Sequence, residues 1–200
     1  MTKKILITGA NGQLGHEMRN ALKGNNRFEC IFTDVAELDI CNTEAVKQTM
    51  ANNHIDYIVN CAAYTQVDKA EDNAELCKKI NTDAVENLAR AAADYGARMI
   101  HISTDYVFNG RGYRPYTEDM VPDPQSVYGS TKLEGEKILT DICPESIIIR
   151  TAWLYSPYGN NFVKTMLHLG EEREELSVVA DQIGTPTCAA DLAQAILVIL

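Results

Sequence analysis

The sequence predicts an α/β fold, a Rossmann-like doubly wound parallel sheet with helices on both faces. Short runs that are apolar throughout alternate with helical windows, which is the pattern of a parallel sheet covered on both sides. A glycine-rich turn follows the first apolar run and opens the first helical window. The 200 residues are 46% hydrophobic and 23% charged, as in an ordinary globular chain with a substantial core.

Six strands are predicted, in the order in which their apolar runs occur: 5–7, 28–33, 57–61, 99–102, 147–149 and 176–179. Helices are expected over 13–23, 43–53, 70–95, 126–142 and 191–200. Asn42 suits the N-cap of the second helix, and Gly96 suits the stop of the third. Pro115, Pro122 and Pro124 predict a long surface loop over 113–124, after a strand end where loops often carry function.

Charge and composition exclude several classes of protein. The net charge of −10 offers no broad basic surface for nucleic acid. The longest apolar runs are far too short to cross a membrane, and the N-terminus has no signal-peptide pattern. The six cysteines show no CxxC spacing and read as free thiols. We therefore expect a cytoplasmic protein with neither membrane nor nucleic acid as a partner.

The segment Thr8-Gly-Ala-Asn-Gly-Gln-Leu-Gly15 predicts a dinucleotide site, although it is one residue longer than the common fingerprint. Gly9 allows a tight turn, Gly12 lets the backbone approach a pyrophosphate, and Gly15 lets the helix pack close to the sheet. The N–H groups at the start of a helix favour an anion there. The simpler alternative is a structural glycine turn.

Asp34 follows the second predicted strand and can accept hydrogen bonds from the hydroxyls of an adenosine ribose. It would repel a 2′-phosphate, and no arginine lies between Ile31 and Ile40 to receive one. Taken alone, this favours NAD over NADP. The alternative is a solvated loop aspartate.

Tyr128 and Lys132 are four residues apart, which places both side chains on one face of a helix. An ammonium group beside a phenol lowers its pKa and makes it a better acid–base group. Such a pair is common by chance on ordinary helix surfaces. It gains weight from Ser103-Thr104-Asp105 at the end of the fourth strand, where a hydroxyl can bond a reacting carbonyl oxygen. The four histidines are scattered, and His101 reads as a core or sheet-edge residue.

Taken together, these motifs resemble the extended short-chain dehydrogenase/reductases and, more narrowly, the dTDP-4-dehydrorhamnose reductase family. The resemblance covers the whole chain and rests on the segments 9–15, 38–40, 60–71, 103–108, 128–136, 150–153, 159–162 and 181–187. It implies reduction of the C4 ketone of dTDP-4-dehydro-L-rhamnose by NADPH or NADH, to give a precursor of cell-surface polysaccharide. It also allows a homodimer with magnesium at its contact, for which the sequence offers no ligand cluster.

The same resemblance implies a role for each matching residue. Tyr128 would be the proton donor, Lys132 would tune Tyr128 and hold the nicotinamide ribose, and Thr104 would orient the carbonyl. Thr104, Asp105 and Trp153 would contact the sugar, although Trp153 could be core packing instead. The cofactor would meet a larger set: Gly12, Gln13 and Leu14 at the pyrophosphate, Asp34 at the ribose, Asp39 and Ile40 beside the adenine, and Ala63, Tyr64 and Thr65 along the third strand.

Two other functions on the same scaffold stay open. One is a nucleotide-sugar epimerase or dehydratase, although Tyr106 stands where a dehydratase usually has a glutamate. The other is a non-catalytic dinucleotide-binding regulatory subunit. We expect residues 1–150 to form the dinucleotide-binding domain with the catalytic pair. We expect residues 151–200 to begin a substrate-binding region and, since the family continues further, we expect that region to be truncated here.

Overall fold

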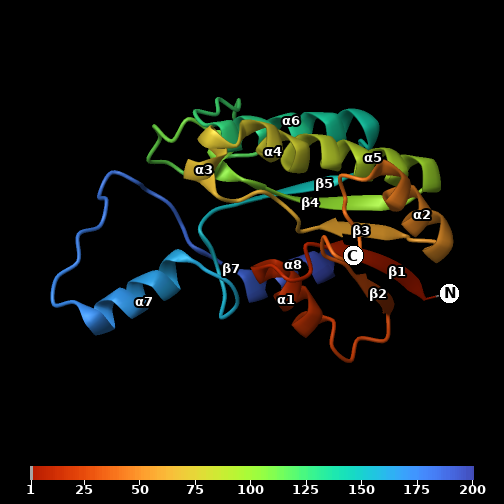
Figure 1. The fold of residues 1–200 in the computed structure, drawn as a ribbon, viewed down its shortest axis with the longest axis horizontal. Helices are drawn as coiled ribbons and strands as arrows, with labels where there is room; N and C mark the ends of the chain where they lie inside the picture. Colours follow the sequence, from red (N-terminus) through yellow and green to blue (C-terminus); the bar gives the residue numbers. More distant parts are fainter. Residues whose placement is uncertain (1) are drawn as a thin grey trace.

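A computed structural model describes residues 2–200 and contains a five-stranded parallel sheet in the order β2-β1-β3-β4-β5 (Figure 1). The strands are β1 (Lys3–Thr8), β2 (Phe28–Phe32), β3 (Tyr57–Asn60), β4 (Arg98–Thr104) and β5 (Ile147–Thr151). The first five predicted strands and the doubly wound fold class are therefore confirmed. The order reverses beside β1, so the carboxyl ends of β1 and β3 flank a crevice of the kind that binds ligands in such sheets.

Helices cover both faces of the sheet, as Figure 1 shows. One face carries α2 (Thr43–Asn53), α5 (Ala84–Tyr95) and α6 (Val127–Ile142), which bury Leu6, Leu88 and Leu139 against the strands. The other face carries α1 (Gln13–Ala21) and α8 (Ala189–Ile199), which cover Ile5 and Ile7. The sheet is thus buried on both sides, which explains why its strands are apolar throughout.

The predicted helix ends at Asn42 and Gly96 are confirmed. The Asn42 side chain accepts a hydrogen bond from the backbone N–H of Ala45 at 3.1 Å, as an N-cap does. Gly96 ends α5 with φ of +67°, a left-handed conformation that favours glycine.

The single helix predicted over 70–95 is wrong in its detail. The segment consists of α3 (Val67–Asp72), α4 (Ala74–Lys78), a π-helical turn η1 (Lys79–Asp83) and α5. Asn73 leaves the helical conformation between α3 and α4, with φ of −126° and ψ of 43°. The π turn places the Asn81 and Thr82 side chains against α6, a use of the wider turn that propensity does not signal.

The strand predicted over 176–179 is also wrong. Those residues are irregular, and Val178 and Val179 are 51% and 65% exposed, so no neighbouring strand covers them. A small parallel pair forms instead between β6 (Leu154–Tyr155) and β7 (Thr187–Cys188). Between them α7 (Phe162–Glu172) projects from the body of the domain without a buried residue (Figure 1). The loop predicted over 113–124 is irregular, as expected. No helix within residues 2–200 is long and apolar enough to span a bilayer.

Candidate functional site

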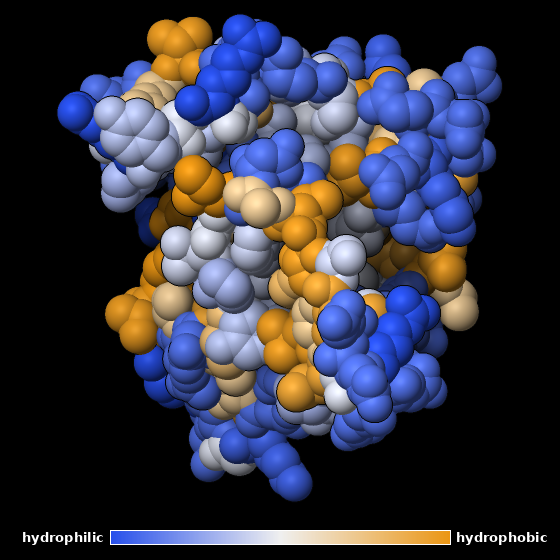
Figure 2. Space-filling model, turned by 90° about the vertical axis from the view of Figure 1, so that its left-hand side faces the viewer, coloured by the Kyte–Doolittle hydropathy of each residue, from blue (hydrophilic) through white to orange (hydrophobic). Residues whose placement is uncertain are grey.

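A cleft of about 1130 Å³ opens along the carboxyl ends of the strands. Figure 2 looks onto this side of the molecule, where apolar and weakly polar residues run across the middle and hydrophilic residues surround them. The cleft is lined by the glycine-rich turn, by the loops after β2 and β3, by the end of β4, by α6, and by the segment after β5. These segments are far apart in the sequence, and the parallel topology brings them to one edge.

The glycine-rich turn has no room for side chains. A Cβ on Gly9 would lie 2.7 Å from the backbone of Ala62, and one on Gly15 would lie 2.4 Å from the Gly9 oxygen. Gly15 therefore lets α1 pack against the turn itself, whereas we expected contact with the sheet, and it does not line the cleft. Gly12 is the N-cap of α1, and no side chain caps this helix start. Backbone N–H groups there are available to an anion.

Asp34 lies in the cleft and also holds the turn in place. Its carboxylate accepts the backbone N–H of Asn11 at 2.9 Å and that of Val35 at 2.8 Å. The first bond ties the loop after β2 to the glycine-rich turn. Asp34 is therefore not simply a solvated loop residue, and its contact with a ribose remains a prediction.

Gln13 connects the turn to the segment after β5. Its side-chain amide donates to the Leu154 carbonyl at 3.3 Å, and its oxygen accepts from the Asn161 side chain at 2.9 Å. His16 on the same helix stacks on Tyr158, with ring centroids 4.4 Å apart. The start of α1 thus positions the segment that completes the cleft.

Most of the other predicted cofactor residues lie in the cleft wall: Leu14, Asp39, Ile40, Ala63 and Thr65. Tyr64 does not. Its backbone N–H and carbonyl are both bonded to the Asn81 side chain, at 2.9 Å and 3.1 Å, and its side chain packs against the cluster of Ala70, Cys77 and Tyr128. Tyr64 therefore ties the loop after β3 to the π turn and does not line the cleft itself.

Tyr128 stands in the first turn of α6, where three features fix its place. The Ser126 side chain caps the helix by accepting the Gly129 N–H at 3.1 Å. A Cβ on Gly129 would lie 2.2 Å from the Tyr106 carbonyl, so glycine allows the helix to approach the end of β4 closely. The Tyr106 and Tyr128 rings then meet edge to face, 5.5 Å apart.

Thr104, whose hydroxyl is expected to orient the carbonyl, lies at the end of β4 and lines the cleft. Its oxygen accepts the Tyr106 N–H at 3.2 Å and donates to Asp105 at 3.3 Å. Burial raises the pKa of Tyr128 to about 12, and hydrogen bonding with Thr104 acts in the opposite direction. Burial likewise raises the pKa of the Asp105 carboxyl, which also lines the cleft.

Lys132 lies one helical turn from Tyr128 and is 1% exposed. Its Nζ donates to the Ile102 carbonyl at 2.7 Å and lies 3.2 Å from His101 Nε2. Desolvation lowers its pKa to about 8. The expected lowering of the Tyr128 pKa by Lys132 is therefore absent in this arrangement, because the amine faces β4 and burial dominates at the phenol.

Trp153 has a left-handed backbone, with φ of 47°, which is rare and strained for a large side chain. Its ring lies in the cleft wall and packs against Gly184, where an added Cβ would sit 3.0 Å from the indole. The ring is partly exposed, so core packing does not account for it alone.

We expect Trp153→Ala to raise the KM for a sugar nucleotide or lower kcat, with the affinity for a dinucleotide unchanged. The reason is that the indole lines the cleft together with Thr104 and Asp105, the residues expected to contact the sugar. Steady-state kinetics and dinucleotide titration test this. A loss of stability alone, with unchanged kinetics per folded molecule, would show that Trp153 is a core residue.

Sequence reasoning assigned no role of its own to Ser103 and missed Lys79. The Ser103 hydroxyl is buried in the cleft wall without a hydrogen-bond partner in the described chain. Lys79 adds a cation from the π turn. The only sequence feature that could have indicated Ser103 is its position next to Thr104. No sequence feature indicates Lys79, because the π turn that brings it to the cleft is not predictable. Cys61 also lines the cleft, and burial raises the pKa of its thiol to about 12.

A doubly wound sheet, a glycine-rich turn at a helix start, and a Tyr–Lys pair in the same cleft define the class of short-chain dehydrogenase/reductases. Comparison with known proteins identifies the family within this class. Residues 3–200 match the family described as "RmlD substrate binding domain", and the chain belongs to that family.

The chain is 48% identical, over 193 residues, to the dTDP-4-dehydrorhamnose reductase of Escherichia coli K12, covering 94% of this chain and 64% of that protein. A solved dTDP-4-dehydrorhamnose reductase from Clostridium acetobutylicum is 52% identical with a TM-score of 0.95, and covers 98% of this chain and 69% of its own. Another, from Bacillus anthracis in complex with NADP, is 44% identical with a TM-score of 0.96, and covers 100% and 70%. The chain thus spans about two thirds of the length of these relatives.

Proposed function

We propose that this protein reduces the C4 ketone of dTDP-4-dehydro-L-rhamnose to dTDP-L-rhamnose with NADPH or NADH. The observation that carries the proposal is that Thr104, Tyr128 and Lys132 line the same cleft as the glycine-rich turn, beside Asp105 and Trp153. The similarity to reductases of that name supports the same substrate.

The residues present fit a dinucleotide. The cleft exceeds the range of about 300–1,000 Å³ typical of small-molecule sites, as an extended cofactor with a sugar nucleotide requires. Gly12 and the uncapped start of α1 would hold the pyrophosphate with Gln13 and Leu14, and Asp34 would hold the ribose. Asp39 and Ile40 would flank the adenine, and Ala63 and Thr65 would follow the chain of the cofactor. The buried Ser103 hydroxyl offers an additional hydrogen-bond donor.

When bound, the reduced dinucleotide supplies a hydride to the sugar C4. Tyr128 gives its phenolic proton to the carbonyl oxygen as negative charge develops there. Thr104 orients that oxygen with its hydroxyl. Lys132 holds the ribose next to the nicotinamide and, in its charged form, stabilises the phenolate left on Tyr128. Asp105 and Trp153 position the sugar, so the protein contributes placement and electrostatics.

The Asp34 carboxylate should affect the affinity for NADH and the affinity for NADPH to different extents. Asp34→Ala should weaken NADH more than NADPH, because it removes a charge-assisted hydrogen bond worth roughly 1.5–3 kcal/mol and relieves repulsion of a 2′-phosphate. The change also frees the Asn11 N–H, which weakens both cofactors alike. The ratio of the two dissociation constants is therefore the diagnostic quantity. An unchanged ratio would mean that Asp34 only holds the turn.

The reductase function is tested by stoichiometry. Limiting dTDP-4-dehydro-L-rhamnose is incubated with excess NADPH, and oxidised cofactor and dTDP-rhamnose are both counted. A reductase consumes one cofactor for each product molecule. An isomer of the keto sugar formed without cofactor oxidation would favour an epimerase, and binding without any reaction would favour a regulatory subunit. The intact Thr104, Tyr128 and Lys132 speak against that subunit.

Two accompanying predictions remain proposals. Residues 1–150 would form the cofactor-binding part with the catalytic pair, and residues 151–200 would begin the part that binds the sugar nucleotide. A homodimer is proposed only from the family resemblance. For magnesium, residues 2–200 contain no group of three His, Cys, Asp or Glu side chains able to hold a metal ion, so we do not propose it.

A further inference from the structure

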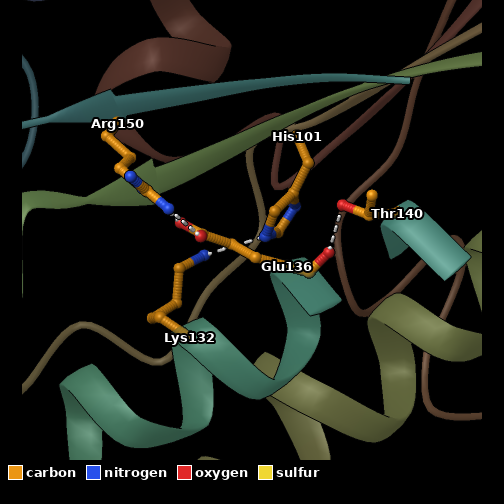
Figure 3. A network of polar contacts seen from close by, with 5 residues as sticks. All are labelled: His101, Lys132, Glu136, Thr140 and Arg150. Carbon is orange, nitrogen blue, oxygen red and sulfur yellow. Dashed lines mark hydrogen bonds and ion pairs between the residues drawn. The ribbon is translucent and has the colours of Figure 1, made fainter. Parts of the chain in front are cut away.

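A chain of buried polar side chains runs beneath the cleft from β1 to α6. The Thr8 hydroxyl donates to Asn60 Oδ1 at 2.6 Å, and the Asn60 amide lies 3.1 Å from His101 Nδ1. His101 Nε2 is 3.2 Å from Lys132 Nζ, which donates to the Ile102 carbonyl at 2.7 Å. The Thr8, Asn60, His101 and Lys132 residues are each no more than 1% exposed. Figure 3 shows His101 and Lys132 turned toward each other above α6.

The hydrogen-bond directions in this chain determine where His101 carries its hydrogen. The backbone N–H of Ala62 can only donate, and it donates to Asn60 Oδ1 at 3.2 Å. The Asn60 NH₂ group must therefore be the one that faces His101, so Nδ1 of the ring is an acceptor. A neutral imidazole then has its hydrogen on Nε2. Burial keeps the pKa of His101 well below its usual value, so the ring stays neutral.

An Nε2–H cannot accept a hydrogen bond from an ammonium group, whereas an uncharged amine can accept one from it. We propose, on the basis of the proposed dinucleotide function, that His101 is a positioning residue that holds Lys132 at alkaline pH as an uncharged amine facing β4. Lys132 then gains a proton when it turns from His101 to a bound dinucleotide. At high pH, the binding of a dinucleotide thus produces the charged form of Lys132, which holds the ribose and stabilises the phenolate of Tyr128.

Three other ionisable groups lie around Lys132: Glu136, Cys77 and Tyr128. Glu136 on the same helix is paired with Arg150 of β5, with 2.6 Å between Oε2 and Nη2 (Figure 3). Cys77 of α4 faces Lys132 as well, and its sulfur contacts Thr131 at 3.2 Å. Tyr128 has its pKa raised to about 12 by burial. Desolvation lowers the pKa of Lys132 to about 8.

The tautomer is tested on the unliganded protein. A long-range ¹H–¹⁵N NMR spectrum distinguishes a protonated Nε2 from a protonated Nδ1, and the signal missing in His101→Gln identifies the residue. We expect a neutral ring with hydrogen on Nε2 at pH 9. Hydrogen on Nδ1, or a doubly protonated ring, would overturn the proposal whether or not the protein proves to be a reductase.

Proton uptake is tested by titrating NADH from pH 7 to pH 9. The unaltered protein should lose about tenfold in affinity over this range, because binding takes up one proton above the Lys132 pKa of about 8. Asn60→Asp replaces the amide by an acceptor, which moves the ring hydrogen to Nδ1 and lets Nε2 accept from charged Lys132. The affinity of the Asn60→Asp variant for NADH should therefore fall by less than about threefold over the same pH range.

Thr8→Val is the matched control, because it removes a hydroxyl from the same buried chain while the Ala62 N–H still fixes the Asn60 orientation. It should keep the pH dependence of the unaltered protein. Equal pH dependence in Asn60→Asp and Thr8→Val would contradict the role of His101. A protein that binds no NADH at all would refute the proposed function, while the tautomer result would still stand.

Discussion

Tyr128→Phe should reduce turnover by about 10²–10⁴-fold, the usual contribution of a positioned acid. The substitution removes the phenolic proton from the side chain that lines the cleft beside Thr104, and leaves no other hydroxyl on α6 in its place. Turnover is measured as oxidation of NADPH in the presence of the 4-keto sugar nucleotide. The reduction should appear in kcat, because the proton is transferred as the transition state forms.

The control for this variant is dinucleotide affinity, which should stay within about twofold, because phenylalanine keeps the ring contacts. In the structure that ring packs on Ala70 and Cys77 and meets Tyr106 edge to face. Full activity in Tyr128→Phe would exclude this residue as the acid. Equal loss of binding and turnover would instead indicate a damaged cleft.

Arg150→Met should destabilise the fold by about 3 kcal/mol, near the lower end of the cost of leaving a buried charge unpaired. Arg150 donates to both carboxylate oxygens of Glu136, at 3.0 Å and 2.6 Å (Figure 3). The Glu136 side chain is only 4% exposed, so its charge has little access to water. The arginine is 26% exposed, which moderates the effect. Urea unfolding of both proteins gives the difference.

The double variant Glu136→Gln with Arg150→Met is the matched control for that result. A neutral amide does not need a counter-charge, so the double variant should recover most of the lost stability. Equal stability of Arg150→Met and the unaltered protein would show that the ion pair contributes nothing. Additive losses in the two single variants would mean that packing on Phe108, 5.0 Å from the guanidinium, carries the effect.

The sequence predicted the five main strands because each is buried on both faces, as Ile5, Leu6 and Ile7 illustrate, and such runs are apolar throughout. The turn at Gly9–Gly15 and the Tyr128–Lys132 spacing predicted residues that the fold brings into one cleft, because local pattern and topology act together there. Trp153 was recognised by its place after β5, and its strained backbone agrees with a role beyond packing.

Other features depend on contacts that local pattern does not record. The π turn at Lys79–Asp83 and the pairing of Tyr64 with Asn81 come from packing between α5, α6 and the loop after β3. The direction of Lys132 toward His101 also depends on a strand distant in sequence. Residues 176–179 misled the prediction because an apolar run resembles a buried strand even where no neighbouring strand is present.

The most direct test of the account is the fate of the hydride. NADPH carrying deuterium at the transferable C4 position is incubated in ordinary water with the protein and dTDP-4-dehydro-L-rhamnose, and the product is examined by mass spectrometry and NMR. We expect dTDP-L-rhamnose with one deuterium at the sugar C4, and at least about a hundredfold less of it from Tyr128→Phe over the same time. Product without deuterium at C4 would contradict it.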